Sequence, residues 1–418
     1  EGDYHLLKPG NYHADTSELI TMLQKGHHGV QLDREAWERL VAWIDLNVPD
    51  FGTWSERYGD DKLAKQKQLR TDLMAMYANV HREAEVVPDA PRAPVKPIIP
   101  DPPAPRVVQA VECDQWPLTP AEAVNAQKNA APKITKTIDI GNGVTMDFVL
   151  IPAGEFVMGD PNGNDDELPL TRVRIEKPFW MSVTEVTNEQ YNAFDPAHHS
   201  GYADQQWKDH TTPGYPLFQP KRPVVRVNYE DAANFASWIS GKMGMPCDLP
   251  TEAQWEYACR AGSDAAFAFG GMDADFSRHA NLADASIRLL AVKGVDPKPI
   301  DNPTILENFV PRDARFNDGA LITTEVGQYQ PNAWGLHDMH GNAAEWTRTL
   351  YRPYPYDKSD GRETGRGDGR MVVRGGSWRD RPHLARAGYR LSYPAWQMVY
   401  NVSFRVICEV TPNRVAAN

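Results

Sequence analysis

The first 85 residues carry hydrophobic side chains at helical spacing. Thr16 and Ser17 offer N-cap oxygens to an apolar run over residues 18–23, and Gly26 ends that segment. Apolar residues spaced three and four apart predict a second helix from about residue 33 and a third over about 62–79. We therefore expect residues 1–85 to form a helical segment.

Beyond residue 134 the pattern changes to short alternating runs, separated by Gly, Asn, Asp and Pro, which is typical of strands. Two helices are expected among them, one from Thr187 or Asn188 and one after Asn228. Thr251 and Gln254 form a capping pair that opens a third helix. The expected strands contain residues 138–140, 146–150, 156–158, 173–175 and 179–183.

Residues 88–120 contain ten prolines, which favour an extended spacer without regular hydrogen bonds. From about residue 262 to 330 the chain is rich in turn residues, so we expect loops held by something other than a ladder. The expected organisation is a helical segment (1–85), a Pro-rich linker or strap (86–133), an α+β domain (134–412) and a tail (413–418).

Composition narrows the classes of partner. The formal net charge of −12, without a basic cluster, disfavours nucleic acid. No run of about 18 apolar residues predicts a membrane span. The chain begins at Glu1 rather than Met, which is typical of a processed product or a fragment.

Two carboxylates bracket a Gly-containing turn in the segment LHDMHGNAAEW. Asp338 and Glu345, with main-chain carbonyls between them, supply the oxygen ligands that Ca²⁺ prefers. The alternative is that both are ordinary turn and capping acids. On residue spacing alone we favour the second interpretation.

Five segments together resemble the formylglycine-generating enzyme family, also called sulfatase-modifying-factor domains, over about residues 136–412. They are PAGEFVMG (152–159), LPTEAQWEYACRAG (249–262), NAWGLHDMHGNAAEWT (332–347), VVRGGSW (372–378) and FRVICE (404–409). The resemblance implies a loop-rich α+β fold of the C-type-lectin-like kind.

The resemblance also implies two calcium sites and a disulfide. The first site would use Asp338, Gly341, Ala343 and Glu345, the middle two through backbone oxygens. The second would use Asn281, Leu282, Asp318 and Ala320. The implied disulfide joins Cys259 and Cys408, and two buried free thiols are the alternative.

Activity is a separate matter, because Asp380 and Ala385 occupy the positions of the family's two reactive cysteines. Neither residue offers the sulfur that Cu(I) prefers, so we expect no copper and no formylglycine-generating activity. Residues after Gly376 could still form a groove for an anionic or aromatic ligand. The candidate groove residues are Ser377, Trp378, Arg379, Asp380, Arg381, His383 and Arg386. The alternative, which we favour, is that Trp378 is core and that Arg374, Arg386, Arg390 and Arg405 form internal salt bridges.

Residues 12–54 resemble the end of the cytochrome-c-like region in multidomain bacterial envelope proteins similar to the hydrazine synthase alpha subunit. The chain has no Cys-x-x-Cys-His, so a haem is expected only on an upstream fragment or a partner.

We therefore expect a non-catalytic, calcium-stabilised binding or assembly module of the bacterial envelope, periplasmic or extracellular and associated with a redox protein. The expected partners are another protein or an upstream fragment of the same precursor, together with a small anionic or glycan ligand. The competing hypothesis is an iron- or haem-dependent oxidoreductase subunit whose ligands are not identifiable in this chain.

Overall fold

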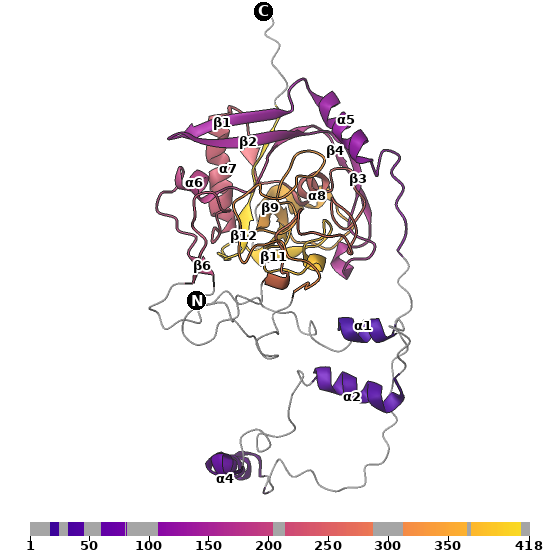
Figure 1. Ribbon diagram of the computed structural model, residues 1–418, viewed down its shortest axis with the longest axis vertical. Coiled ribbons are helices and arrows are strands. Elements are labelled where there is room, and N and C mark those ends of the chain that lie inside the picture. The colour runs from indigo at the N-terminus through magenta and orange to yellow at the C-terminus, as the bar shows by residue number, and fades with distance from the viewer. Residues whose placement is uncertain are drawn as a thin grey trace, which may run out of the picture. The chain divides into compact units, whose positions relative to one another are not determined.

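The computed structural model describes residues 17–24, 32–45, 60–79, 81, 108–203, 214–286, 312–365 and 369–410. The chain forms two compact units, of which one comprises residues 4–105 and the other contains residues 106–418 (Figure 1). In the first unit the described helices are α1 (Glu18–Gln24), α2 (Arg34–Asp45) and α4 (Asp60–Ala78). These confirm the expected N-terminal helices. Residues 82–107, which hold most of the prolines, and the tail 413–418 lie outside the described residues.

The larger unit begins earlier than expected. Helix α5 (Pro120–Ala130) starts at a capping box in which the Thr119 hydroxyl accepts from the Glu122 amide. Gln127 is buried, and its side-chain amide donates to the carbonyl oxygens of Leu150 at 3.0 Å and Trp334 at 2.9 Å. Because α5 thereby satisfies main-chain acceptors of the domain, its residues belong to the domain rather than to the linker assigned to 86–133.

Two antiparallel-rich sheets form the framework. The five-stranded sheet is antiparallel throughout, and the four-stranded sheet contains one parallel pair, β9 with β12. The first has the order β1 (Thr135–Gly141), β2 (Val144–Ile151), β5 (Phe179–Ser182), β13 (Ile407–Glu409), β8 (Cys247–Asp248). The second has the order β11 (Leu391–Pro394), β10 (Arg370–Arg374), β9 (Ala344–Leu350), β12 (Val402–Phe404). Two small hairpins add β3 (Gly154–Met158) with β4 (Thr171–Ile175), and β6 (Tyr202–Ala203) with β7 (Tyr215–Pro216).

Capping boxes begin the remaining helices, α6 (Asn188–Asn192), α7 (Tyr229–Met243) and α8 (Glu252–Arg260). The caps are Thr187, Asn228 and Thr251, as the sequence predicted. Helix α7 packs against β1, β8 and β13, while α8 contacts β3, β9 and β10 in the centre of the domain (Figure 1). Short 3₁₀ turns occupy Asp165–Glu167, Lys358–Asp360, Arg362–Thr364 and Pro382–Leu384.

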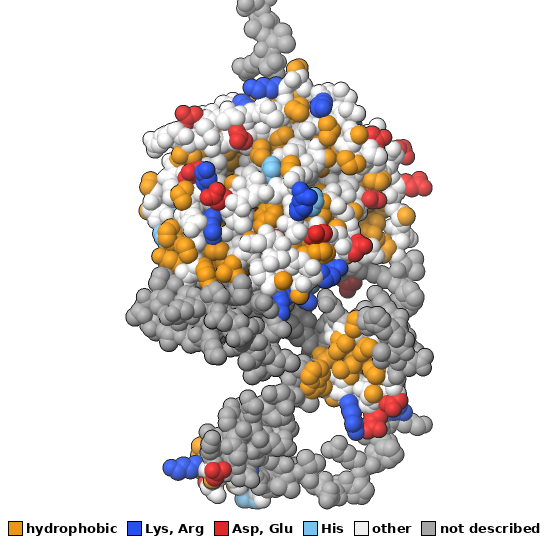
Figure 2. Space-filling view, viewed as in Figure 1, with side chains coloured by type: hydrophobic (Ala, Val, Ile, Leu, Met, Phe, Trp, Pro, Cys, Tyr) orange, Lys and Arg blue, Asp and Glu red, His pale blue; other side chains and the backbone are white. Residues whose placement is uncertain are grey.

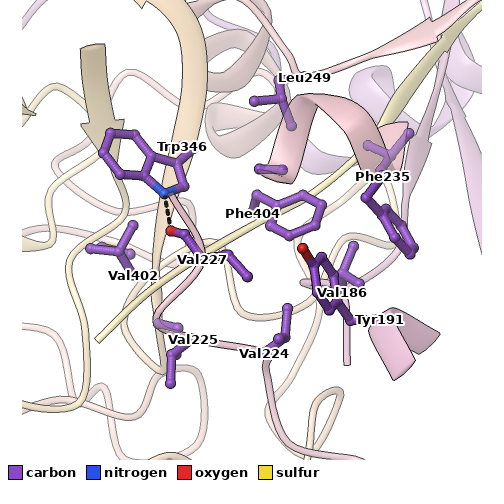
Figure 3. Close-up of a cluster of buried hydrophobic side chains, with 14 of the residues drawn as sticks. Val186, Tyr191, Val224, Val225, Val227, Phe235, Leu249, Trp346, Val402 and Phe404 are labelled. Carbon is purple, nitrogen blue, oxygen red and sulfur yellow. Dashed lines mark hydrogen bonds between the residues drawn. The ribbon is translucent and has the colours of Figure 1, made fainter. Parts of the chain in front are cut away.

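The main core lies between α7 and the two sheets. Tyr191 stacks on Phe235 with ring centroids 5.6 Å apart, and Phe235 meets Phe404 edge-on at 5.5 Å. The indole of Trp346 is buried and donates to the Val227 carbonyl at 3.0 Å (Figure 3). The signature segments FRVICE and GNAAEWT therefore contribute directly to the core.

The surface gives two further results. Charged side chains of both signs are interspersed over the visible face of the larger unit (Figure 2). Among the described residues, no helix has the length and apolar character needed to cross a bilayer.

Candidate functional site

Helix α8 carries three buried charged residues at four-residue spacing, Glu252, Glu256 and Arg260. Glu256 pairs with Arg374 of β10 and accepts a hydrogen bond of 2.9 Å from Arg260, and all three side chains are buried. Arg374 also donates to the Gly388 carbonyl at 2.8 Å. Buried, charge-assisted hydrogen bonds of Arg374 therefore link helix α8, strand β10 and the segment around Gly388.

Arg390 and Arg386, the latter a residue of the expected ligand groove, face inward as well. Arg390 donates to Glu252 at 2.6 Å and lies over the rings of Tyr351 and Tyr354, at 4.6 and 4.2 Å from their centroids. Arg386 is buried and bridges Asp160 and Glu167. Arg386 is thus a structural residue, which corrects its assignment to a groove and confirms the internal salt-bridge alternative.

A second charged centre surrounds Glu345 at the start of β9. Arg405 donates to both of its carboxylate oxygens at 2.6 Å, and the Trp255 indole donates to one of them at 2.6 Å. Arg405 also binds the main-chain oxygens of Ser182 and His337, each at 3.1 Å. Glu345 is therefore fully engaged by protein donors.

Asp338 and Glu185 lie beside this pair with less support. Asp338 accepts from the Gly327 amide at 2.6 Å, and Glu185 accepts from the Asn342 side chain at 3.0 Å. The second oxygen of each carboxylate is buried without a hydrogen-bond partner. Burial, reinforced by the neighbouring carboxylates, raises the pKa of Glu185 well above its ordinary value, and burial raises the pKa of Asp338.

The turn between Asp338 and Glu345 is tight and left-handed at three positions. Asp338, Gly341 and Asn342 have φ values of 57°, 82° and 56°. A Cβ on Gly341 would lie 2.1 Å from the Asn281 carbonyl oxygen, so only glycine fits there. The turn thus brings Gly341, a residue of the first expected calcium site, against the Asn281 segment.

The four residues of the second expected site also come together. The Leu282 amide donates to Asp318 at 2.8 Å, and Asp318 accepts from the Ala320 amide at 2.8 Å. The Asn281 side chain instead donates to the Ile322 carbonyl at 2.9 Å and to Asn342 at 3.2 Å. Asp284 is buried next to Asp318, whose pKa rises to about 7 through burial and the Asp284 charge.

The donor atoms at these positions can be compared with the ligands that calcium prefers. Within the described part of the chain, no group of three or more His, Cys, Asp or Glu side chains could hold a metal by itself. Calcium takes six to eight oxygens, including carbonyls and water. The orphaned oxygens of Asp338 and Glu185 beside a carbonyl-rich turn fit that donor set, with main chain and water completing it.

The loop after Gly376 is closed by its own side chains. Asp380 accepts from the Ser377 amide at 2.9 Å and from its hydroxyl at 2.6 Å, and Asn401 donates to that hydroxyl oxygen at 2.8 Å. Ser377 and Trp378 are buried, whereas Arg379 is exposed and Asp380, Arg381 and His383 are partly exposed. The expected groove is therefore not lined by Ser377 or Trp378.

Ala385 lies in an apolar satellite cluster with Phe267, Phe276 and Leu282. A Cβ on Gly376, whose φ is 67°, would lie 2.9 Å from the Ala385 Cβ. The Ala385 carbonyl accepts from His340 Nδ1 at 2.8 Å. Position 385 is thus buried and closely packed.

A family model for the sulfatase-modifying factor enzyme 1-like domain matches residues 141–410. The chain belongs to this family.

Similar curated proteins include both formylglycine-generating enzymes and a relative named as inactive. The inactive C-alpha-formylglycine-generating enzyme 2 of Bos taurus is 25% identical over 313 residues, covering 64% of this chain and 90% of that protein. The formylglycine-generating enzyme of Streptomyces coelicolor is 28% identical over 276 residues, covering 55% and 78%. A serine/threonine-protein kinase, pkn1 of Chlamydia pneumoniae, is 28% identical over 267 residues, and the match covers 59% of this chain but only 35% of the kinase.

Among solved structures, PvdO from Pseudomonas aeruginosa has 28% sequence identity and a TM-score of 0.50, covering 67% of this chain and all of PvdO. The expected family and its loop-rich, mixed helix-and-sheet fold are therefore confirmed.

The disulfide of this sulfatase-modifying-factor domain differs from the expected one. Cys408 of β13 is bonded to Cys247 of β8, not to Cys259. The two strands are neighbours in the five-stranded sheet, and residues 247 and 408 are register partners. Cys259 is a buried free thiol whose sulfur lies 3.4 Å from His340 Nε2. Burial raises the pKa of this thiol and lowers the pKa of His340 to about 4, so both groups are neutral at pH 7.

Three of these residues escaped the sequence reasoning. Glu185 and Asp284 lie in segments, VTEVTN and NLADAS, where nothing in residue spacing relates them to Asp338 or Asp318. Cys247 could have been found by pairing the short run before LPTEAQW with the C-terminal strand. Sequence alone offered no register for that pairing.

Proposed function

We propose that this chain is a non-catalytic, calcium-stabilised member of its family that serves as a binding or assembly module in the bacterial envelope. The observation that carries the proposal is the pair Asp380 and Ala385, which occupy the positions of the family's reactive cysteines. One closes the turn at Ser377, and the other fills a packed apolar position.

The residues present do not suit a copper ion. Soft Cu(I) prefers thiolate or thioether ligands. Asp380 is a hard oxygen donor already engaged by Ser377, and the Ala385 methyl offers no donor. Cys259, the free thiol nearest this loop through His340, is fully buried with a raised pKa, which opposes thiolate formation. The match to the inactive C-alpha-formylglycine-generating enzyme 2 of Bos taurus, which covers 90% of that protein, agrees with this proposal.

Calcium is the ion that the oxygen-rich turn suits. The first site would draw on Asp338, Gly341, Ala343 and Glu345, and the second on Asn281, Leu282, Asp318 and Ala320. At the first site a buried carboxylate oxygen of Asp338 lacks a hydrogen-bond donor. At the second site the carboxylates of Asp318 and Asp284 repel each other. A bound cation would supply the missing positive charge and hold loops that have little regular structure.

The envelope location and the partners follow from weaker support. A disulfide between Cys247 and Cys408 is typical of an oxidising compartment such as the periplasm or the cell exterior. Arg379, Arg381 and His383 reach solvent in part and would meet a small anionic or glycan ligand. A protein partner, or an upstream fragment bearing a haem, would complete a redox-associated assembly.

A direct assay tests the absence of catalysis. The chain would be loaded with Cu(I) and incubated aerobically with a cysteine-containing sulfatase peptide, and the peptide mass would be followed. The Streptomyces coelicolor enzyme serves as positive control. We expect no conversion by this chain, and conversion of the cysteine to formylglycine would overturn the proposal.

A further inference from the structure

Glu185 is a buried acid of the domain core that is only half satisfied by hydrogen bonds. It follows β5 and is fully buried. One oxygen accepts a hydrogen bond of 3.0 Å from Asn342, and the other has no partner. An ionised carboxylate with a bare buried oxygen is costly unless a proton or a cation compensates it.

The charges around Glu185 do not balance. Three carboxylates meet here, Glu185, Asp338 and Glu345, and Arg405 is the guanidinium paired with them. Arg405 gives both of its carboxylate hydrogen bonds to Glu345. His337, the neighbouring titratable group, directs its Nδ1 to the Tyr329 carbonyl at 2.7 Å. The three carboxylates and the single guanidinium of Arg405 together leave two negative charges, which one divalent cation would balance.

The bare oxygens belong to the same two acids. Asp338 has one oxygen on the Gly327 amide and the other buried without a partner, as Glu185 has. Asn342 connects the two acids, because it holds Glu185 and lies in the turn that begins at Asp338.

We propose that Glu185 and Asp338 supply the carboxylate oxygens to the cation of the first calcium site, and that Glu345 is the ion-pair partner of Arg405 rather than a main ligand. This inference rests on the calcium site proposed above and revises its ligand set, since Glu185 replaces Glu345. All the available donors are oxygens, so the site favours Ca²⁺ over softer metals.

Protonation is the competing way to neutralise the two acids. A proton on the bare oxygen of Glu185 would itself need an acceptor, and that oxygen makes no hydrogen bond with a described residue. A calcium ion needs no acceptor and takes up several oxygens at once.

Calcium binding to the full chain, measured by titration calorimetry after removal of metal with a chelator, tests the assignment. Glu185→Gln keeps the shape and removes the charge, and we expect calcium to bind about 10–100-fold more weakly. Glu167→Gln is the matched control, because Glu167 is equally buried but is paired with Arg386. Its calcium affinity is expected to match that of the unchanged chain, even though its stability falls.

The outcomes separate the two levels of the proposal. If the unchanged chain binds no calcium, the proposed site itself is wrong. If it binds calcium and Glu185→Gln binds equally well, only the role of Glu185 is wrong. Asp338→Asn provides a second variant, with the same loss of affinity expected.

Discussion

The ion pairs that join helix α8 to Arg374 and Arg390 differ from the loop that follows Gly376, although both lie close together in the sequence. Glu256 with Arg374 and Glu252 with Arg390 are buried and paired, and Glu252, Glu256 and Arg374 belong to segments that resemble the family. The loop from Ser377 to Arg386 keeps a tight main chain but carries Asp380 and Ala385 where chemistry would need sulfur. The signature segments therefore specify how this fold buries its polar groups, whereas the proposed absence of catalysis depends on a few side chains in the loop.

The largest expected effect is the contribution of the buried ion pairs to the free energy of unfolding. Glu256→Ala leaves Arg374 and Arg260 buried with unpaired charge, so we expect a loss of about 3–5 kcal/mol in the free energy of unfolding. Urea denaturation followed by tryptophan fluorescence measures it. Glu155→Ala is the control, because its partner Arg172 is half exposed, and that loss is expected to stay below about 1 kcal/mol. Similar small losses in both variants would refute the structural role.

The covalent link at the edge of the five-stranded sheet is the next largest contribution. Cys247→Ser opens a loop that spans 161 residues in sequence, and we expect about 2–5 kcal/mol of destabilisation under oxidising conditions. Under a reductant strong enough to open the bond, the variant and the unchanged chain are expected to unfold at nearly the same denaturant concentration. An unchanged midpoint for the oxidised variant would contradict the assigned pairing.

Metal removal separates the loops from the framework. At calcium concentrations 100 times the dissociation constant, binding contributes about 2.7 kcal/mol to stability. We therefore expect a chelator to lower the melting temperature, and added calcium, but not magnesium at the same concentration, to restore it. A transition that is the same with chelator and with calcium would remove the calcium sites from the account.

The pH dependence sharpens that result. Glu185 and Asp338 have ordinary pKa values of 4.5 and 3.8, and both are raised in the folded chain. Above about pH 4.5 the unfolded chain releases these protons while the calcium-free folded chain still holds them. Stability due to these groups therefore falls as the pH rises, by at most about 1.4 kcal/mol per pH unit for each proton. Denaturation of chelator-treated protein between pH 5 and 8 measures the slope, and calcium is expected to flatten it; a slope that calcium leaves unchanged would count against the site.

The smallest effect lies in the loop itself. Asp380→Ala removes two hydrogen bonds to Ser377, so we expect a loss of about 1–2 kcal/mol with no change in calcium stoichiometry. Asp380→Asn, which retains an acceptor oxygen, is expected to lose less. A large loss, comparable with that of Glu256→Ala, would erase the distinction between the two regions.

Local signals in the sequence were sufficient for much of the fold. The caps at Thr187, Asn228 and Thr251 and the alternation in β1 to β5 are encoded within a few residues, so they could be predicted. Strands such as β8 and β13 are only two or three residues long, and their pairing depends on contacts across 161 positions. The family resemblance implied Cys259 as the partner of Cys408, and no local signal in the sequence pointed to Cys247 instead.

The candidate site shows the same division. Asp338 and Glu345 stand out because they bracket a turn in one segment. Glu185 becomes important only because the fold places it next to them, and the engagement of Glu345 by Arg405 depends on three elements meeting in space. Sequence motifs indicated where a cation would bind, whereas the balance of charge required the folded chain.

The most direct test of the central claim is elemental analysis of the chain as isolated, purified without chelators, by inductively coupled plasma mass spectrometry. We expect at least one calcium per chain and neither copper nor iron at a stoichiometric level. Stoichiometric copper or iron, or an absence of calcium from chains that remain folded, would contradict it.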